Sequence, residues 1–171
     1  RLSVVLCFFF LIIRQPPRST LDRSSAASDV YKRQVEQRFF GDPLFKAIRL
    51  SYVFSSDDTF TNYLRKCSDN GVEAEIFHPF YRAAIHREDV LRGAIALAQN
   101  WDAFSHPVIN FGGPSVISRI EFAQTLKEIS FPKLRFRQTD PAPEFFANRP
   151  RSIHMKSALL ASLLGRPPRS L

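Results

Sequence analysis

Apolar and polar positions repeat along this chain with two periods, one typical of strands and one typical of helices. Four runs, either rich in β-branched and aromatic residues or alternating in character, are predicted to be strands: Ala47–Phe54, Val72–Phe77, Val108–Phe111 and Leu134–Gln138. Four segments with helical spacing of apolar residues or helix-end signals are predicted to be helices: Thr59–Asn70, His86–Asn100, Ile120–Ser130 and Met155–Leu164. Strands that alternate with helices predict an α/β fold, in which the smaller C-terminal pieces form a lobe beside the sheet.

Turn and cap residues mark where several of these elements begin or end. Gly71 and Gly165 stand directly after predicted helices, in the position of a C-terminal cap. Ser118 and Glu121 make a capping box, in which each side chain satisfies a backbone amide of the first helical turn. The short amphipathic run Val35–Phe40 stops at a Gly-Asp-Pro turn, so we interpret it as the tail of a helix whose start is missing.

The first 34 residues do not share this organisation. The string SSAASDVYKRQ at Ser24–Gln34 resembles the translation of a transposase adapter used in DNA library preparation, and IIRQPPRST at Ile12–Thr20 resembles a flow-cell primer in the same frame. Between the two strings, Leu21–Arg23 leaves the space that a sample index would occupy. We therefore expect residues 1–34 to be non-native translated library sequence without structure, with a genuine secretory leader as the alternative.

Composition limits the class of protein once this segment is set aside. The 171 residues are 44% hydrophobic and 23% charged, which suits one globular domain rather than a disordered chain. Lysine and arginine number 24 against 16 acidic residues, a formal charge of +8. Residues 1–34 hold six of the bases and two of the acids, so 18 bases and 14 acids remain, a net charge of +4. This balance gives little support for nucleic acid as a partner.

Cysteine, histidine and hydropathy exclude further classes. Two cysteines and four scattered histidines cannot build a disulfide framework or a cysteine–histidine zinc site, so no metal ligands are expected. The longest apolar run, Val4–Ile13, would cover only about 15 Å as a helix, roughly half of a bilayer core. A membrane-spanning segment is therefore not expected.

Two basic positions are candidates for binding an anion. In the extended segment Arg82–His86 alternate side chains share a face, so Arg82, Ala84 and His86 point the same way. Arg149 lies in a proline-stiffened loop, where a fixed backbone lowers the entropy lost on clamping a phosphate. Taken singly, each arginine is explained equally well as an exposed side chain without a role.

Four segments carry a family resemblance when they are taken together. They are RLSYVF at Arg49–Phe54, RAAIHREDV at Arg82–Val90, INFGGPSVISRIEFAQTL at Ile109–Leu126 and NRPRSIHMKSALLASLLG at Asn148–Gly165. In this order they resemble the extended short-chain dehydrogenase/reductases, or NAD-dependent epimerase/dehydratase superfamily, and within it the dTDP-4-dehydrorhamnose reductase group. The resemblance implies that residues 35–171 are the C-terminal part of a Rossmann-like doubly wound sheet plus a small substrate-binding lobe.

The resemblance also implies an activity and site residues. Members of the group transfer a hydride from NADP or NAD, in reduced form, to a 4-keto sugar nucleotide, and they are cytoplasmic. By this resemblance Arg82 and Arg149 hold the diphosphate of the substrate, and Tyr52 faces the substrate. Ser51 and Val53 line the nicotinamide. The implied partners are a nucleotide sugar and, in the full-length protein, a second copy in a homodimer, with no nucleic acid and no membrane.

Two motifs of the family are missing, which leaves the activity open. Neither the glycine-rich dinucleotide loop nor the Tyr-x-x-x-Lys pair for proton transfer occurs in the chain, and the adapter-like segment occupies their expected place upstream of Val35. We therefore expect an inactive fragment without a catalytic residue of its own. His154 and Ser55 also depart from the aspartate and glycine that many relatives carry. A nucleotide-sugar epimerase or dehydratase, or a non-catalytic binding relative, is the alternative to a reductase.

Overall fold

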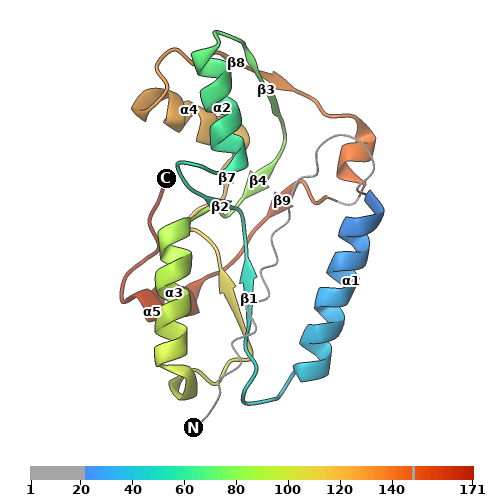
Figure 1. Ribbon diagram of the computed structural model, residues 1–171, viewed down its shortest axis with the longest axis vertical. Coiled ribbons are helices and arrows are strands. Elements are labelled where there is room, and N and C mark those ends of the chain that lie inside the picture. Colours follow the sequence, from blue (N-terminus) through green and yellow to red (C-terminus); the bar gives the residue numbers. More distant parts are fainter. Residues whose placement is uncertain (1–21, 148) are drawn as a thin grey trace.

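The computed structural model describes residues 22–147 and 149–171, and its lower half in Figure 1 is built around two parallel strands. Strand β1 (Ala47–Leu50) pairs with β6 (Val108–Phe111) in parallel, with Ile48 opposite Ile109. Helices α3 (Arg87–Gln99) and α5 (Ala158–Leu164) pack on this pair. The core formed there consists of Ile48, Leu50, Ile85, Val90, Leu97, Ile109, Phe111 and Leu160.

A second packed unit occupies the other end of the molecule (Figure 1). Strands β3 (Ala74–Phe77) and β8 (Phe136–Thr139) pair in parallel and are covered by α2 (Thr59–Asp69) and α4 (Arg119–Ile129). Its buried core consists of Phe60, Leu64, Cys67, Ala74, Ile76, Phe122, Ala123 and Leu134. The chain therefore has two cores, and burial of their apolar surface is the main source of stability.

Very short strands connect the two units. Strand β2 (Val53–Phe54) pairs in parallel with β5 (Ile85–His86). Strand β4 (Tyr81–Arg82) lies between β7 (Ile117–Ser118), which is antiparallel to it, and β9 (Ser152–Ile153), which is parallel. The remaining regular elements are the 3₁₀ helices η1 (Trp101–Ala103) and η2 (Pro143–Phe146). This arrangement confirms the predicted α/β class, with mainly parallel strand pairs as in a Rossmann-like fragment.

The cap signals are confirmed in detail. The hydroxyl of Ser118 accepts a hydrogen bond from the Glu121 amide, while the Glu121 carboxylate accepts one from the Ser118 amide at 2.6 Å. Gly71 and Gly165 both adopt φ of +65°, the left-handed conformation that glycine takes at low cost. Helix α2 begins after Asp58, whose side chain accepts hydrogen bonds from the amides of its first turn.

Two sequence predictions differ from the structure. The run Ala47–Phe54 is divided at Ser51 and Tyr52, because β1 pairs with β6 whereas β2 turns to pair with β5. In α3 the predicted apolar side included Leu91 and Ile95, but these side chains are 55% and 58% exposed. The helix instead buries the side that carries Val90 and Leu97, because this side faces β6 and α5.

The prediction that residues 1–34 are unstructured is wrong for residues 22–34, which lie in helix α1 (Asp22–Phe39); residues 1–21 lie outside the described part. The stretch contains neither glycine nor proline, and its alanine, lysine, arginine and glutamine residues favour a helix. The origin of residues 1–34 stays a prediction. Within residues 22–147 and 149–171, no helix combines the length and the apolar character needed to cross a bilayer.

Candidate functional site

The pairing of β4 with β7 places two arginines and one phenylalanine on the same face. Arg82 is opposite Ile117, and the Arg119 amide donates to the Phe80 carbonyl at 3.2 Å, which extends the contact beyond the ladder. Residues directly opposite in an antiparallel pair share a face, as do alternate residues along one strand. Phe80, directly before β4, therefore has Arg82 beside it two residues along the chain and Arg119, the first residue of α4, beside it across the pairing.

Arg82 is buried with an incomplete set of hydrogen bonds. Arg82 is 6% exposed, and its Cζ lies 3.8 Å from the centre of the Phe80 ring. Nη1 donates to the carbonyl of Tyr81 at 2.6 Å and to that of Arg151 at 3.4 Å, whereas the buried Nη2 has no partner. Burial, followed by the charge of Arg119, lowers the pKa of Arg82 to about 10. A buried cation in this condition is suited to receive an anion.

Arg119 is the second guanidinium at this place. Its Cζ lies 4.6 Å from the centre of the Phe60 ring and 4.8 Å from that of Phe80. Burial lowers the pKa of Arg119, and the nearby Tyr52 and Asp58 oppose that shift. Among the described residues, neither Arg82 nor Arg119 forms an ion pair with a carboxylate.

Both arginines line one small pocket at the edge of the second core, to which the lining residue Phe122 belongs. Its walls are mostly apolar and come from the loop after β1, from β4, and from β7 with the first turn of α4. The lining residues are Tyr52, Phe80, Arg82, Ala84, Ile117, Ser118, Arg119 and Phe122. The predicted shared face is confirmed for Arg82 and Ala84. His86, the third residue of that pattern, instead caps α3 by accepting a hydrogen bond from the Glu88 amide at 3.2 Å.

Tyr52 contributes its ring to the pocket, and its hydroxyl donates to Asp58 Oδ1 at 2.7 Å. Burial, with the charge of Asp58 and this hydrogen bond, raises the pKa of Tyr52 far above its ordinary value. The hydroxyl is therefore neutral at physiological pH and already engaged with a protein group. A tyrosine in this state is a wall of the pocket rather than a proton donor.

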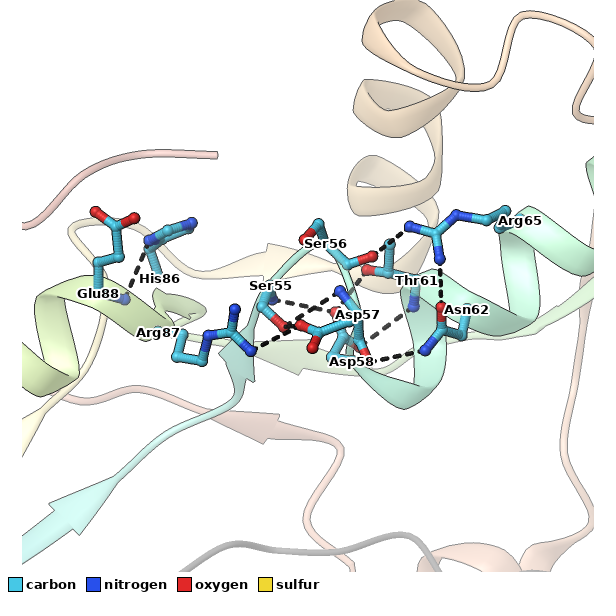
Figure 2. Close-up of polar contacts among 10 residues, drawn as sticks. All are labelled: Ser55, Ser56, Asp57, Asp58, Thr61, Asn62, Arg65, His86, Arg87 and Glu88. Atoms are coloured by element: carbon cyan, nitrogen blue, oxygen red, sulfur yellow. Dashed lines mark hydrogen bonds and ion pairs between the residues drawn. The ribbon is translucent and has the colours of Figure 1, made fainter.

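The turn that holds Asp58 is itself tied into the fold (Figure 2). Asp58 Oδ2 accepts hydrogen bonds from the Thr61 hydroxyl and the Ser55 amide. Its neighbour Asp57 forms an ion pair with Arg87 at 2.8 Å, which connects this turn to the start of α3. The position of Tyr52 is thereby determined from both units of the molecule.

Arg149 does not line this pocket with Arg82. Its Cζ lies 4.8 Å from the centre of the Phe145 ring, and that ring is 5.9 Å from the ring of Phe80. The two arginines that the sequence predicted to act together thus contact two different, neighbouring aromatic rings. Sequence analysis missed Arg119, although it belongs to the segment Ile109–Leu126 that carried part of the resemblance.

Of the two residues predicted to line the nicotinamide, Ser51 directly follows β1 and Val53 begins β2. Ser51 is buried, and its hydroxyl has no hydrogen-bond partner. Val53 packs against the core formed by β1, β6, α3 and α5. No group of histidine, cysteine and carboxylate side chains within the described ranges is arranged to bind a metal ion.

Comparison of the sequence with protein-family models and with curated proteins finds no match. Comparison of the structure with solved structures finds many with the fold of the NAD-dependent epimerase/dehydratase superfamily. The fold of this chain is therefore that of this superfamily, as the resemblance implied. The identities are 20% or less, so the likeness establishes the fold alone.

Three of these structures represent three reaction types. The UDP-glucuronic acid 4-epimerase from Bacillus cereus, solved with UDP-glucuronic acid and NAD, matches with a TM-score of 0.64 and 18% identity over 86% of this chain and 48% of that chain. A dTDP-4-dehydrorhamnose reductase from Clostridium acetobutylicum matches with a TM-score of 0.62 and 11% identity over 93% and 54%. An NAD-dependent NDP-hexosamine 5,6-dehydratase of tunicamycin biosynthesis matches with a TM-score of 0.59 and 20% identity over 91% and 50%. This chain spans about half the length of each.

Proposed function

We propose that this chain is the substrate-binding part of an NAD(P)-dependent enzyme that acts on a nucleotide sugar, and that the pocket at Arg82 receives the diphosphate. One observation carries the proposal: Arg82 is buried in the pocket with its Nη2 lacking any partner. A buried charge without a counter-ion is costly, so a site of this kind is maintained where a ligand supplies the opposite charge.

The chemistry of the guanidinium supports a phosphate as that ligand. Its planar fork can donate two parallel hydrogen bonds to phosphate oxygens, and such charge-assisted bonds contribute on the order of 1.5–3 kcal/mol each. In a poorly hydrated pocket the attraction is stronger than at the surface. The ring of Phe80 holds the fork from one side, which reduces the entropy lost when the ligand binds.

Further residues receive roles in the same proposal. Arg149 reaches the second phosphate or the adjoining ribose from the aromatic rings beside the pocket. The ring of Tyr52 supports the sugar. Ser51 and Val53 contact the nicotinamide, and the unpartnered Ser51 hydroxyl at the end of β1 is consistent with a hydrogen-bonding group of that cofactor. When bound, NAD or NADP supplies the hydride transfer.

The reaction we propose for the full-length enzyme is reduction of a 4-keto sugar nucleotide, with epimerisation or dehydration as alternatives within the superfamily. The pocket contains no lysine, and its tyrosine hydroxyl is engaged by Asp58. This supports the view that the described part of the chain binds substrate without supplying the proton donor. A non-catalytic relative would use the same pocket for binding only.

The test is calorimetric titration of the chain with UDP-glucose and with dTDP-glucose. Replacing Arg82 with methionine should weaken binding by roughly ten- to a hundredfold, because one charged arm is lost. Arg92→Met is the control, since Arg92 lies on the exposed side of α3. Absence of binding by the wild-type chain, or equal binding by the two variants, would reject the proposal. Turnover of NAD(P)H by the full-length protein then separates an enzyme from a binding relative.

A further inference from the structure

We propose that Arg119 is a second substrate-binding residue of this pocket, and that Arg82 and Arg119 together bind one phosphate group beside the ring of Phe80. The identity of the ligand as a nucleotide sugar rests on the function proposed above. The pairing of the two arginines rests on the geometry of β4, β7 and the first turn of α4.

The first support is that both guanidinium groups contact the ring of Phe80. Their Cζ atoms lie 3.8 Å and 4.8 Å from the centre of the same Phe80 ring, and both side chains line the pocket. Backbone pairing enforces this, because the Arg119 amide donates to the Phe80 carbonyl. The two side chains thus reach one ring and one pocket, and the charge of Arg119 acts on Arg82.

The second support is the balance of charge around the pair. Each arginine contributes a positive charge to a half-enclosed, largely apolar space, and neither forms an ion pair among the residues that the structure describes. The nearest acidic group, Asp58, already receives hydrogen bonds from Tyr52, Phe60 and Thr61. Two close cations with no carboxylate between them repel each other, and a phosphate bound to both removes that repulsion.

Arg119 is better placed for this role than Arg149. Arg119 packs on the same ring as Arg82, whereas Arg149 packs on Phe145, one ring further away. The alternative explanation is that Arg119 only stabilises Phe60 and Phe80 by cation–π contacts. That purely structural role predicts lower stability and an unchanged affinity of the folded protein for anions.

The experiment uses inorganic pyrophosphate and UDP-glucose as separate probes in calorimetric titrations of the whole chain. We expect Arg119→Met and Arg82→Met each to weaken pyrophosphate binding at least tenfold. The fold-loss of pyrophosphate affinity in the double variant should be smaller than the product of the two single fold-losses, because both arginines contact one group. Arg119→Lys should restore binding only in part, since a point charge replaces the fork.

Arg65→Met is the matched control. Arg65 also lies over an aromatic ring of the same unit, with Cζ 5.7 Å from the centre of Phe131, but it is outside the pocket. Its loss should lower stability without changing pyrophosphate affinity. If Arg119→Met does not fold, the role of Arg119 is tested by NMR on the wild-type chain. The side-chain Nε–Hε resonances of both Arg82 and Arg119 should shift on titration with pyrophosphate.

The outcomes separate this inference from the proposed function. Wild-type affinity in Arg119→Met together with loss in Arg82→Met, or an unshifted Arg119 resonance, overturns the role of Arg119 and leaves the proposed function standing. Binding of pyrophosphate through both arginines without binding of UDP-glucose or dTDP-glucose supports the paired site and counts against the proposed function. A wild-type chain that binds none of these probes overturns both.

Discussion

The hydroxyl of Tyr52 donates a hydrogen bond of 2.7 Å to the carboxylate of Asp58, the residue that caps helix α2. This contact joins the wall of the pocket to the first turn of a helix in the second unit. The same carboxylate accepts hydrogen bonds from the amides of Phe60 and Thr61. The shape of the pocket is thus coupled to the capping of α2.

The first prediction follows from this contact. Replacing Tyr52 with phenylalanine should lower the free energy of unfolding by about 1.5–3 kcal/mol, because one hydrogen bond to a charged group is lost while the ring remains. Affinity for a nucleotide sugar should stay the same, since the hydroxyl faces Asp58. Urea denaturation and calorimetric titration measure the two quantities. Tyr81→Phe is the control, because the Tyr81 hydroxyl has no hydrogen-bond partner in the described ranges. Loss of affinity without loss of stability would show that the hydroxyl serves the substrate.

The second prediction concerns the buried carboxylate of Asp89, which is 0% exposed. It accepts hydrogen bonds from the Arg166 guanidinium at 2.5 Å and from the Arg169 amide at 2.7 Å, and so ties the C-terminal segment to α3. Burial alone would raise the pKa of Asp89, but the bonds from Arg169 and Arg166 lower it overall. Replacing Asp89 with asparagine should lower the free energy of unfolding by about 2–3 kcal/mol at pH 7. This figure is below that of a fully buried ion pair, because Arg166 and Arg169 are each somewhat more than one-third exposed and solvent screens their charges.

The pH dependence of that loss has a definite sign. The folded pKa of Asp89 lies below the unfolded one, so its contribution is complete above about pH 5 and disappears as the pH falls through the folded value. Denaturation curves of wild type and Asp89→Asn should therefore converge in acid. Asp69→Asn, at an exposed position in α2, should change neither stability nor its slope with pH. Parallel pH curves for wild type and Asp89→Asn would contradict the assignment.

The third prediction concerns the contact of Gly113 with the segment that carries Arg82. A Cβ atom on Gly113 would lie 1.7 Å from the Ala84 carbonyl oxygen, and the Gly113 amide donates to the Ala83 carbonyl at 3.1 Å. Two backbone segments therefore touch with no room for a methyl group. Gly113→Ala should lose about 3 kcal/mol or more, measured by urea denaturation. Ser115→Ala, exposed and two residues away, is the control, and similar curves for the two variants would contradict the close approach.

The fourth prediction tests the origin of the N-terminal segment. Deleting residues 1–34 should change the free energy of unfolding by less than about 1 kcal/mol. Contacts of α1 with the rest of the chain include the ion pair of Glu36 with Arg49 at 2.6 Å and the stacking of Phe39 on Phe45, and these residues remain after the deletion. Amide spectra of residues 47–171 should superimpose on those of the whole chain. A truncated protein that loses its chemical-shift dispersion would show that the segment belongs to the fold.

Several local features could be predicted from the sequence because neighbouring residues decide them. The capping box of Ser118 and Glu121, the left-handed glycines and the bounds of β6 depend on interactions within a few residues. The resemblance likewise led to the correct fold, whereas the role of Arg82 stays a prediction. In α3, by contrast, Leu91 and Ile95 fit an apolar stripe but are exposed, because the position of β6 and α5 decides which side of a helix is buried.

The composition of the pocket depended on the tertiary structure. Strands β4, β7 and β9 have two residues each, too few to show any periodicity, so nothing in the pattern indicated that Phe80 and Arg119 are neighbours. The pairing of Arg82 with Arg149 came from the family resemblance, whereas the fold brings Arg119 to the ring that Arg82 contacts. Residue identity along the chain defines which side chains can bind a phosphate. Which of them meet is decided by hydrogen bonds between strands that are distant in sequence, and no local signal reports those bonds.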